Sequence, residues 1–240
     1  MSKFIIEDSF WELFPQAEIA VVLAKGIDNT QEGAAGIRAE ISANLQRANQ
    51  EAGKFLGAET LSENKAVSVW REAYRRFKTK KGVRCSIEAL LKRVEKGNAV
   101  GSINPLVDIY NAVSLQYGIP CGGEDLDTFE GDLRLTKTVA GGDEFLALGD
   151  EEPDNTLPGE ICYLDDRGAV CRCWNWRDGQ RTMLTEKTRN AFLIIESVDP
   201  CRSAEVREAQ EVLARWTREY LGGVQKLHML DINNREADLD

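Results

Sequence analysis

Apolar residues recur at helical spacing in the first half of the chain and in short separated runs in the second half. Ile37, Ile41 and Leu45 follow one another at four-residue intervals, which predicts an amphipathic helix over residues 30–56, with Gly33 and Gly36 weakening its start. Start and stop residues delimit three further predicted helices, and an apolar run predicts an earlier strand. These helices are expected over residues 60–77, 86–94 and 105–117, and the strand over residues 18–27.

Beyond residue 130 the apolar segments become short and are separated by Gly, Pro, Asp and Asn, a pattern typical of β-sheet. Strands are expected over residues 133–139, 144–148, 160–164, 169–176 and 191–197. A closing helix is predicted over residues 203–221, with Ser203 as its cap and Gly222 as its stop. The acidic tail over residues 231–240 is expected to fray. Helices first, strands later and a helix last favour an α+β fold.

Two helix starts carry local signals. Thr60 is followed three residues later by Glu63, the spacing of a capping box. Asn104 can accept a hydrogen bond from a free amide at a helix start, and Pro105 is tolerated in the first turn. These residues predict helix starts near positions 61 and 105.

The charge balance restricts the possible partners. The 240 residues include 40 acidic and 30 basic side chains, a formal net charge of −10. A uniformly basic protein that coats nucleic acid is excluded, so any RNA contact must use a local basic patch. No apolar run approaches the roughly 20 residues that span a bilayer, and the first residues lack a signal-peptide pattern. The sequence therefore predicts a cytoplasmic protein without a membrane partner.

Cysteine and histidine usage argues against metal chemistry. The six cysteines contain no Cys-x-x-Cys pair, and His228 is the one histidine of the chain. Zinc sites need Cys and His ligands at short spacings, and Cys-His or Ser-His-Asp hydrolases need a catalytic His. We expect reduced thiols, no metal and no cofactor.

A basic stretch over residues 70–84 interrupts the acidic composition. It ends with Arg84, and its other cations, which are the candidates for RNA binding, are Arg71, Arg75, Arg76, Lys78, Lys80 and Lys81. Interleaved Trp70 and Tyr74 could stack on unpaired bases. A solvated helix face with its aromatics turned into the core fits the same pattern equally well.

The segment over residues 105–125 combines polar groups with close glycines. Asp108 and Asn111 lie three residues apart on the predicted helix and therefore share a face. Gly122 and Gly123 permit close backbone approach, and their amides could stabilise an oxyanion. The alternative is a helix followed by a tight turn.

This segment resembles the editing (B3/B4) domain of the phenylalanyl-tRNA synthetase β subunit. The positions that keep the family pattern in step are Pro105, Val107, Asp108, Asn111, Val113, Gly118, Pro120 and Asp125. A second block over residues 184–196 looks like a strand of that family. The segments 131–135, 140–144, 158–163 and 172–179 are similar to its stand-alone branch, so the resemblance covers roughly residues 60–200.

The resemblance implies a three-layer β/β/α fold and a function in translation. It divides the chain into an N-terminal strand and helix over residues 1–59, a B3/B4-like tRNA-binding domain over residues 60–200, and a C-terminal helix and tail over residues 201–240. In the synthetase this domain hydrolyses tyrosine wrongly esterified to the phenylalanine tRNA. A free-standing relative is expected to be an aminoacyl-tRNA deacylase acting in trans on the aminoacylated 3′ end of a tRNA, with no DNA partner, and not a complete synthetase.

The resemblance and the ester chemistry together suggest roles for individual residues. Asn111 is expected to orient water or the terminal ribose, and the amides of Gly122 and Gly123 to stabilise the oxyanion. Substrate ammonium binding or general-base action falls to Glu160, Glu124 or Asp178. The remaining pocket candidates are Arg177, Thr188 and Asn190.

Departures from the family pattern leave the substrate open. The family histidine corresponds to Gly122 and its phenylalanine to Glu124, so tyrosine specificity is not implied. In the predicted strand over residues 169–176, Trp174 and Trp176 share one face, and Asn175 and Arg177 lie on the other. A non-catalytic tRNA- or RNA-binding module and a protein that binds small amino-acid derivatives remain alternatives.

Overall fold

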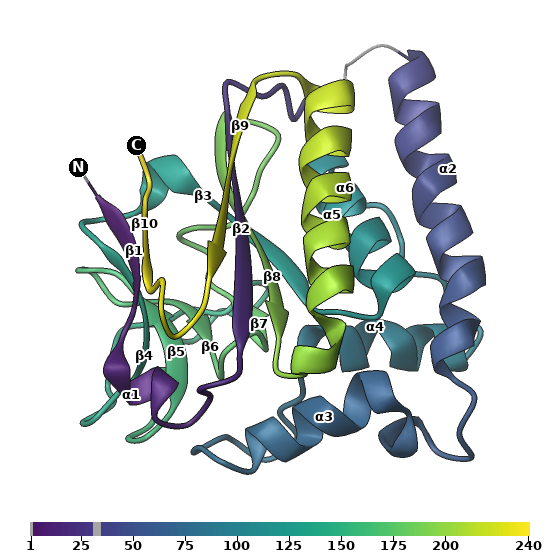
Figure 1. Cartoon of the computed structure of the whole chain (residues 1–240). Coiled ribbons are helices and arrows are strands. Elements are labelled where there is room, and N and C mark those ends of the chain that lie inside the picture. The colour runs from purple at the N-terminus through teal and green to yellow at the C-terminus, as the bar shows by residue number, and fades with distance from the viewer. Residues whose placement is uncertain (1, 31–34) are drawn as a thin grey trace.

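The three layers expected from the resemblance are confirmed by the computed structural model, which describes residues 2–30 and 35–240. Two β-sheets pack face to face, and helices cover the outward face of the four-stranded sheet (Figure 1). The helices are α1 Asp8–Trp11, α2 Ala35–Glu51, α3 Lys65–Tyr74, α4 Ser86–Glu95, α5 Pro105–Tyr117 and α6 Ser203–Leu221. Short 3₁₀ turns occupy Ala52–Phe55, Leu61–Glu63, Leu126–Thr128 and Pro200–Arg202.

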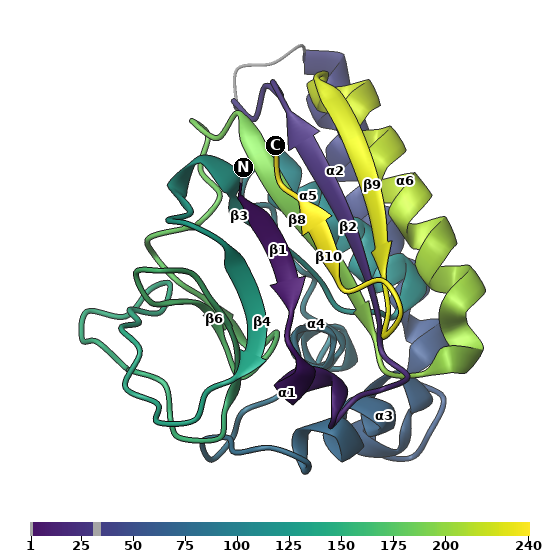
Figure 2. The ribbon, with the colours of Figure 1, turned by 60° about the vertical axis from the view of Figure 1, so that its left-hand side comes forward.

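The strands form an outer and a central sheet. The strands are β1 Lys3–Ile6, β2 Glu18–Lys25, β3 Cys121–Asp125, β4 Leu133–Lys137, β5 Ile161–Leu164, β6 Ala169–Arg172, β7 Arg177–Asp178, β8 Asn190–Ser197, β9 Val224–Leu230 and β10 Glu236–Asp238. The outer sheet has the order β10-β1-β4-β5-β6-β7, and the central sheet β3-β8-β2-β9. Strand β1 pairs in parallel with β4 and antiparallel with β10, which brings the two chain termini together (Figure 2).

Strand β2 is buried on both faces, which explains its continuous apolar run. Ile19, Val21 and Leu23 belong to the core between the sheets. The alternate residues Ala20 and Val22 belong to the core beneath the helices, because successive side chains of a strand point to opposite faces. The central sheet therefore separates two apolar cores.

Helix α5 follows the start and stop signals of its sequence. The Asn104 side chain accepts a hydrogen bond from the Val107 amide at 3.1 Å, and Pro105 occupies the first turn. Gly118 ends the helix with φ of 61°, in the left-handed region that favours glycine. The helix packs against α2 and α6 and leads directly into β3.

The ends of the chain contribute strands that the sequence pattern did not predict. The expectation of a frayed tail over residues 231–240 is wrong, because Glu236–Asp238 pairs with β1. Val224–Leu230 forms a second unpredicted strand, which pairs with β2. Strand β9 is largely exposed and β10 is short, so neither shows a clear apolar alternation. Both sheets draw strands from the chain segments on either side of residues 60–200.

Three other predicted elements differ in the structure. Residues 144–148 form no strand and contribute only an isolated bridge from Ala147 to Gly179. The capping box at Thr60 opens a 3₁₀ turn, and α3 begins four residues later and ends at Tyr74. Part of the predicted helix over residues 30–56, including Gly33, falls on residues 31–34, outside the described residues; a 3₁₀ turn follows the described helix at Ala52.

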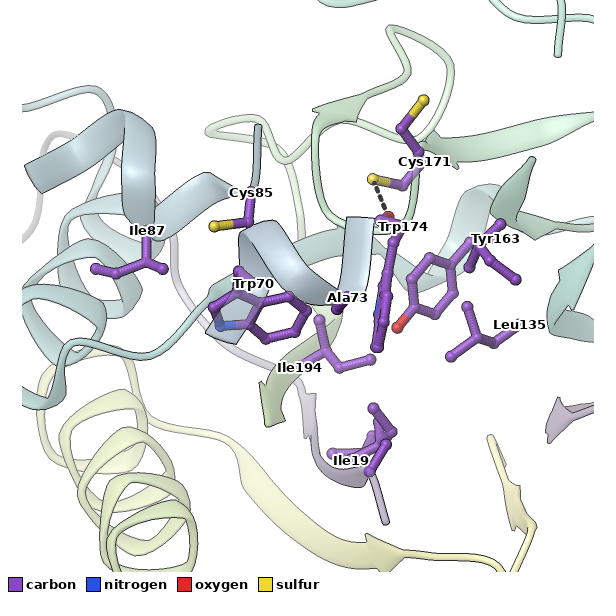
Figure 3. Packing of buried hydrophobic residues seen from close by; sticks show 14 of the residues in the cluster. Ile19, Trp70, Ala73, Cys85, Ile87, Leu135, Tyr163, Cys171, Trp174 and Ile194 are labelled. Atoms are coloured by element: carbon purple, nitrogen blue, oxygen red, sulfur yellow. Dashed lines mark hydrogen bonds between the residues drawn. The ribbon is translucent and has the colours of Figure 1, made fainter. Parts of the chain in front are cut away.

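The hairpin between β6 and β7 is the largest local departure, since the predicted strand over residues 169–176 ends at Arg172. Cys173 and Trp174 adopt positive φ values of 46° and 64°, which non-glycine residues rarely do. Figure 3 shows Trp174 among Trp70, Ala73 and Tyr163 in the core between the sheets. Its ring centroid lies 5.0 Å from that of Trp70 in an edge-to-face arrangement, so Trp70 is a core residue rather than a base-stacking one.

Candidate functional site

A cavity opens between the two sheets where β3, at the edge of the central sheet, faces the β6–β7 hairpin of the outer sheet. Its volume is about 70 Å³, room for several water molecules. Glycines, aromatics and three carboxyl groups line it. The polar side chains among its walls are Ser86, Glu124, Tyr163, Asn175, Asp178 and Glu196.

The register of β3 decides what each glycine contributes. Gly122 lies opposite Ile194, and the Glu196 amide donates to Pro120 O at 3.1 Å, which sets the alternation of hydrogen-bonded pairs. By this alternation the Gly122 amide belongs to the ladder with β8 and is not free for an oxyanion. The Gly123 amide points away from β8, toward the open edge of the strand.

The two glycines also differ in the space around them. A Cβ on Gly122 would meet only Ile194, at 3.8 Å, so the absence of a side chain there leaves room in the cavity. A Cβ on Gly123 would approach Leu193 to 2.7 Å and Leu184 to 3.1 Å. Gly123 is therefore required for packing, whereas Gly122 shapes the cavity.

Two acids of the cavity wall are poorly compensated. Glu124 is 6% exposed, and its Oε2 atom has no hydrogen-bond partner among the described residues. Burial and the neighbouring Asp178 charge raise the pKa of Glu124 well above the usual value for a glutamate, although the Thr182 hydroxyl and the Arg181 charge act to lower it. Burial likewise raises the pKa of Asp178. A pair of poorly compensated carboxyl groups of this kind is suited to bind a cation.

Glu196 lines the same cavity but has a full set of donors. It accepts hydrogen bonds from the Tyr163 hydroxyl, from Trp174 Nε1 at 2.6 Å and from Asn175 Nδ2 at 2.6 Å. Burial raises the pKa of Glu196 to about 7, against the opposing effect of these three donors. Glu196 thus fixes the hairpin that closes the cavity, a role that sequence reasoning missed although the residue ends the block 184–196.

Glu160 lies in a different environment from the one predicted for a catalytic acid. It is fully buried, and it accepts from Arg172 Nε at 2.9 Å and Arg172 Nη2 at 2.6 Å. The Cys173 and Leu157 amides donate to it at 2.9 Å each. It does not line the cavity, and its contacts hold the turn at Cys173.

The remaining predicted pocket residues lie outside the cavity walls. Thr188 donates to Asp125 Oδ2 at 2.6 Å, and Asn190 donates to Asp127 at 2.9 Å, so both tie loops together at the far end of β3. Asn111 is buried on α5 at 8% exposure and is also absent from the walls. The structure therefore does not bring Asn111, Thr188 or Asn190 into this cavity.

Arg177 faces away from the cavity that Asp178 lines. Its guanidinium donates to both carboxylate oxygens of Asp150, at 2.8 and 3.0 Å, and lies 5.7 Å from the Trp176 ring centroid. Neighbouring residues of a strand point to opposite sides, so β7 forms a wall with an acidic inner and a basic outer surface.

The basic stretch is largely engaged within the protein. Arg71 donates to Glu88 at 2.6 and 3.1 Å, Lys80 pairs with Asp154, and Arg75 pairs with Glu72 on the surface. The Arg76 guanidinium lies 5.0 Å from the Phe14 ring centroid. Within the described residues, the cations of the stretch that show neither an ion pair nor a ring contact are Lys78, Lys81 and Arg84.

The described residues hold neither a metal-binding cluster nor a membrane-spanning helix. In the described part of the chain, no group of three or more His, Cys, Asp or Glu side chains is arranged to hold a metal ion. The described helices include none with the length and apolar character required to cross a bilayer.

Comparisons with known proteins agree with the observed fold. The sequence model of the B3/4 domain family matches residues 69–221. The chain is 35% identical over 103 residues to the phenylalanine–tRNA ligase β subunit of Xanthomonas oryzae pv. oryzae strain MAFF 311018, which covers 43% of this chain and 13% of that protein. It is 33% identical over 98 residues to the corresponding subunit of Idiomarina loihiensis, covering 40% of this chain and 12% of the relative.

A solved structure resembles nearly the whole chain. An N-terminal fragment of the phenylalanyl-tRNA synthetase β subunit from Pyrococcus horikoshii superposes with a TM-score of 0.50 at 10% sequence identity. The superposition covers 92% of this chain and 49% of the fragment. At this identity the similarity concerns the fold. The sequence matches to curated relatives span about an eighth of those proteins' length.

Proposed function

The chain belongs to the B3/4 domain family, and from this premise we propose that it hydrolyses the ester of a mischarged aminoacyl-tRNA in trans. The acyl group would enter the cavity between β3 and the β6–β7 hairpin. The observation that carries the proposal is the Glu124 carboxyl, buried in the cavity wall with an unpartnered oxygen and a second acid, Asp178, beside it.

An aminoacyl ester offers the group that this pair lacks. Its α-amino group is a cation around neutral pH, and an ammonium supplies three hydrogen-bond donors. Binding it between Glu124 and Asp178 relieves their mutual repulsion and satisfies the orphan oxygen, which otherwise destabilises the folded chain. An uncharged or anionic acyl group gains neither effect, so the pair selects for an amino acid.

Hydrolysis requires modest assistance because an aminoacyl ester is already activated. The chain must place a water molecule against the carbonyl carbon and stabilise the developing oxyanion. In its ionised form, Glu124 or Asp178 can accept a proton from that water, and the raised pKa makes it a stronger base than an ordinary carboxylate. The Gly123 amide, which the β8 ladder does not use, is the proposed oxyanion donor.

The nucleic-acid part of the substrate follows from the relatives. Their names describe β subunits of a tRNA ligase, and the region shared with this chain amounts to 13% of the first of them. We therefore assign tRNA as the carrier of the ester, without a synthetase reaction. The amino acid is not fixed by this reasoning, since Gly122 and Glu124 replace the family's histidine and phenylalanine.

The test is a panel of mischarged tRNAs incubated with the protein and with Gly122→Leu. The leucine side chain would project into the cavity from a position where its Cβ meets nothing closer than 3.8 Å. We expect loss of at least one ester above the buffer rate with the unmodified protein, and at least a tenfold slower loss with Gly122→Leu. Gly122→Ala, which adds one methyl group, is the matched control. No ester lost above the buffer rate would refute the proposal.

A further inference from the structure

A second and much larger cleft lies on the outer side of the β6–β7 hairpin. It is formed by the end of α4, the turn that follows and the hairpin, and its volume is about 920 Å³. Five cations and no acid line it: Arg84, Lys92, Arg93, Lys96 and Arg177. Within the described residues, Arg177 is the member of this set with a carboxylate partner. In a protein of net charge −10 this is a concentrated basic surface.

The helix dipole explains only part of this cluster. Lys92 and Arg93 lie in the last turn of α4, where cations offset the negative helix end. Lys96 is the C-cap of α4 and gains from the same effect, whereas Arg84 precedes the helix and Arg177 lies on β7, so these two gain little from the dipole, which acts within a single turn. The five cations converge on one cleft, an arrangement that attracts an anionic ligand.

The cleft and the acyl cavity share a wall. Trp176 lines both, and its indole is partly exposed. In β7, Asp178 lines the cavity while the adjacent Arg177 lines the cleft. A ligand with an acylated end in the cavity therefore has its next groups at the cleft, where it meets cations and an aromatic ring.

We propose that this cleft binds the sugar-phosphate backbone of a single-stranded RNA 3′ end, with Trp176 stacking on an unpaired base. The inference rests on the proposed function, because the adjoining acyl cavity is what makes an RNA end the ligand. It also moves the RNA contact from the basic stretch over residues 70–84, whose cations are mostly paired, to the end of α4. Phosphate binding by free Lys and Arg and base stacking on an indole are the two elements of single-strand recognition.

The test compares two triple variants with the same change in net charge. Lys92→Gln, Arg93→Gln and Lys96→Gln remove cleft cations, whereas Arg75→Gln, Lys78→Gln and Lys81→Gln remove exposed cations of the basic stretch. The probe is an RNA hairpin with a four-nucleotide single-stranded 3′ end that carries no amino acid. Its binding affinity is measured over a series of salt concentrations.

We expect the cleft variant to bind roughly tenfold to a hundredfold more weakly and its salt slope to fall by about 2, as loss of three single-strand phosphate contacts implies. The control variant should keep the slope of the unmodified protein. Equal losses in both variants, or no loss in the cleft variant, would overturn the assignment, because long-range charge or another surface would then account for binding.

The variant Trp176→Ala distinguishes binding of a single-stranded RNA end from binding of an RNA duplex. Loss of base stacking should weaken binding of the overhanging hairpin about fivefold or more, and leave a blunt hairpin unaffected. Equal weakening for both probes would overturn the strand-end assignment.

The two proposals fail separately. Cleft-dependent RNA binding in a protein that hydrolyses no ester leaves this inference standing and removes the proposed function. If the cleft variant hydrolyses the ester at an undiminished rate at RNA concentrations below saturation, the proposed function remains and the assignment of the cleft to RNA is removed.

Discussion

Glu160 and Glu124 are both buried glutamates, and their surroundings are opposite. Glu160 has a bidentate arginine and two backbone amides around its carboxylate. Glu124 has an unpartnered oxygen and a neighbouring acid, Asp178. A buried charge with a complete set of partners maintains the fold, whereas one without them raises the free energy of the folded state unless a ligand completes it. The difference separates a structural acid from a candidate binding acid.

Removing the structural acid should have the largest effect. Glu160→Gln removes one of the two carboxylate partners of the fully buried Arg172 guanidinium, leaving only Asp154, and weakens the support of the turn at Cys173. We expect the free energy of unfolding to fall by about 3–5 kcal/mol, the usual result of breaking a buried ion pair from one side. Urea denaturation followed by circular dichroism measures it. A loss below about 1 kcal/mol would show that the pair is not what holds the hairpin.

The two glycines of β3 provide a smaller and matched contrast. Gly123→Ala forces a methyl group to within 2.7 Å of Leu193, so we expect a destabilisation of about 1–3 kcal/mol from overpacking. Gly122→Ala meets only ordinary contact and should change stability by less than about 1 kcal/mol. Thermal unfolding of both variants under one set of conditions gives the comparison. Equal effects would contradict the assignment of Gly123 to packing and Gly122 to the cavity.

Replacing Glu124, the candidate binding acid, should stabilise the folded protein, whereas replacing Glu160 should destabilise it. The folded-state pKa of Glu124 is raised, so the folded chain binds more protons than the unfolded chain above the ordinary glutamate pKa, and its stability falls as pH rises through that window. Glu124→Gln removes this penalty. The variant should melt at a higher temperature than the unmodified protein at pH 8, and the two should converge at pH 4. A variant less stable than the unmodified protein at pH 8 would indicate that Glu124 has a partner that stabilises its charge.

The elements that local signals specify were predictable from the sequence. Asn104, Pro105 and Gly118 delimit α5 through interactions within a few residues of each helix end. The layered fold was predicted from the family pattern around Asp108 and Asn111, because proteins that share such a pattern share a tertiary fold. Strands β1 and β10 were not predictable, since they are short and each is stabilised by a partner more than a hundred residues away.

The candidate site was only partly predictable for a related reason. The sequence shows which residues are acids and cations, but not their partners in space. Glu160 and Glu124 are alike in the sequence, and only the fold reveals that Arg172 neutralises one of them. In the same way, Arg71 and Lys80 looked available, whereas Glu88 and Asp154 bind them. Glu124, Asp178 and Glu160 were alternatives in the sequence, and only the fold shows that Glu124 and Asp178 line one cavity while Glu160 does not.

The most direct test of the account is single-turnover hydrolysis of the mischarged tRNA found in the panel, by the unmodified protein and by Glu124→Gln at pH 8. If the unpartnered carboxyl binds the substrate ammonium or takes the proton of the attacking water, the variant should hydrolyse the ester about 100-fold more slowly or worse, the usual scale for a proton-transfer group. It should do so while being at least as stable as the unmodified protein. An equal rate for the two proteins would contradict the central claim that this cavity performs the chemistry.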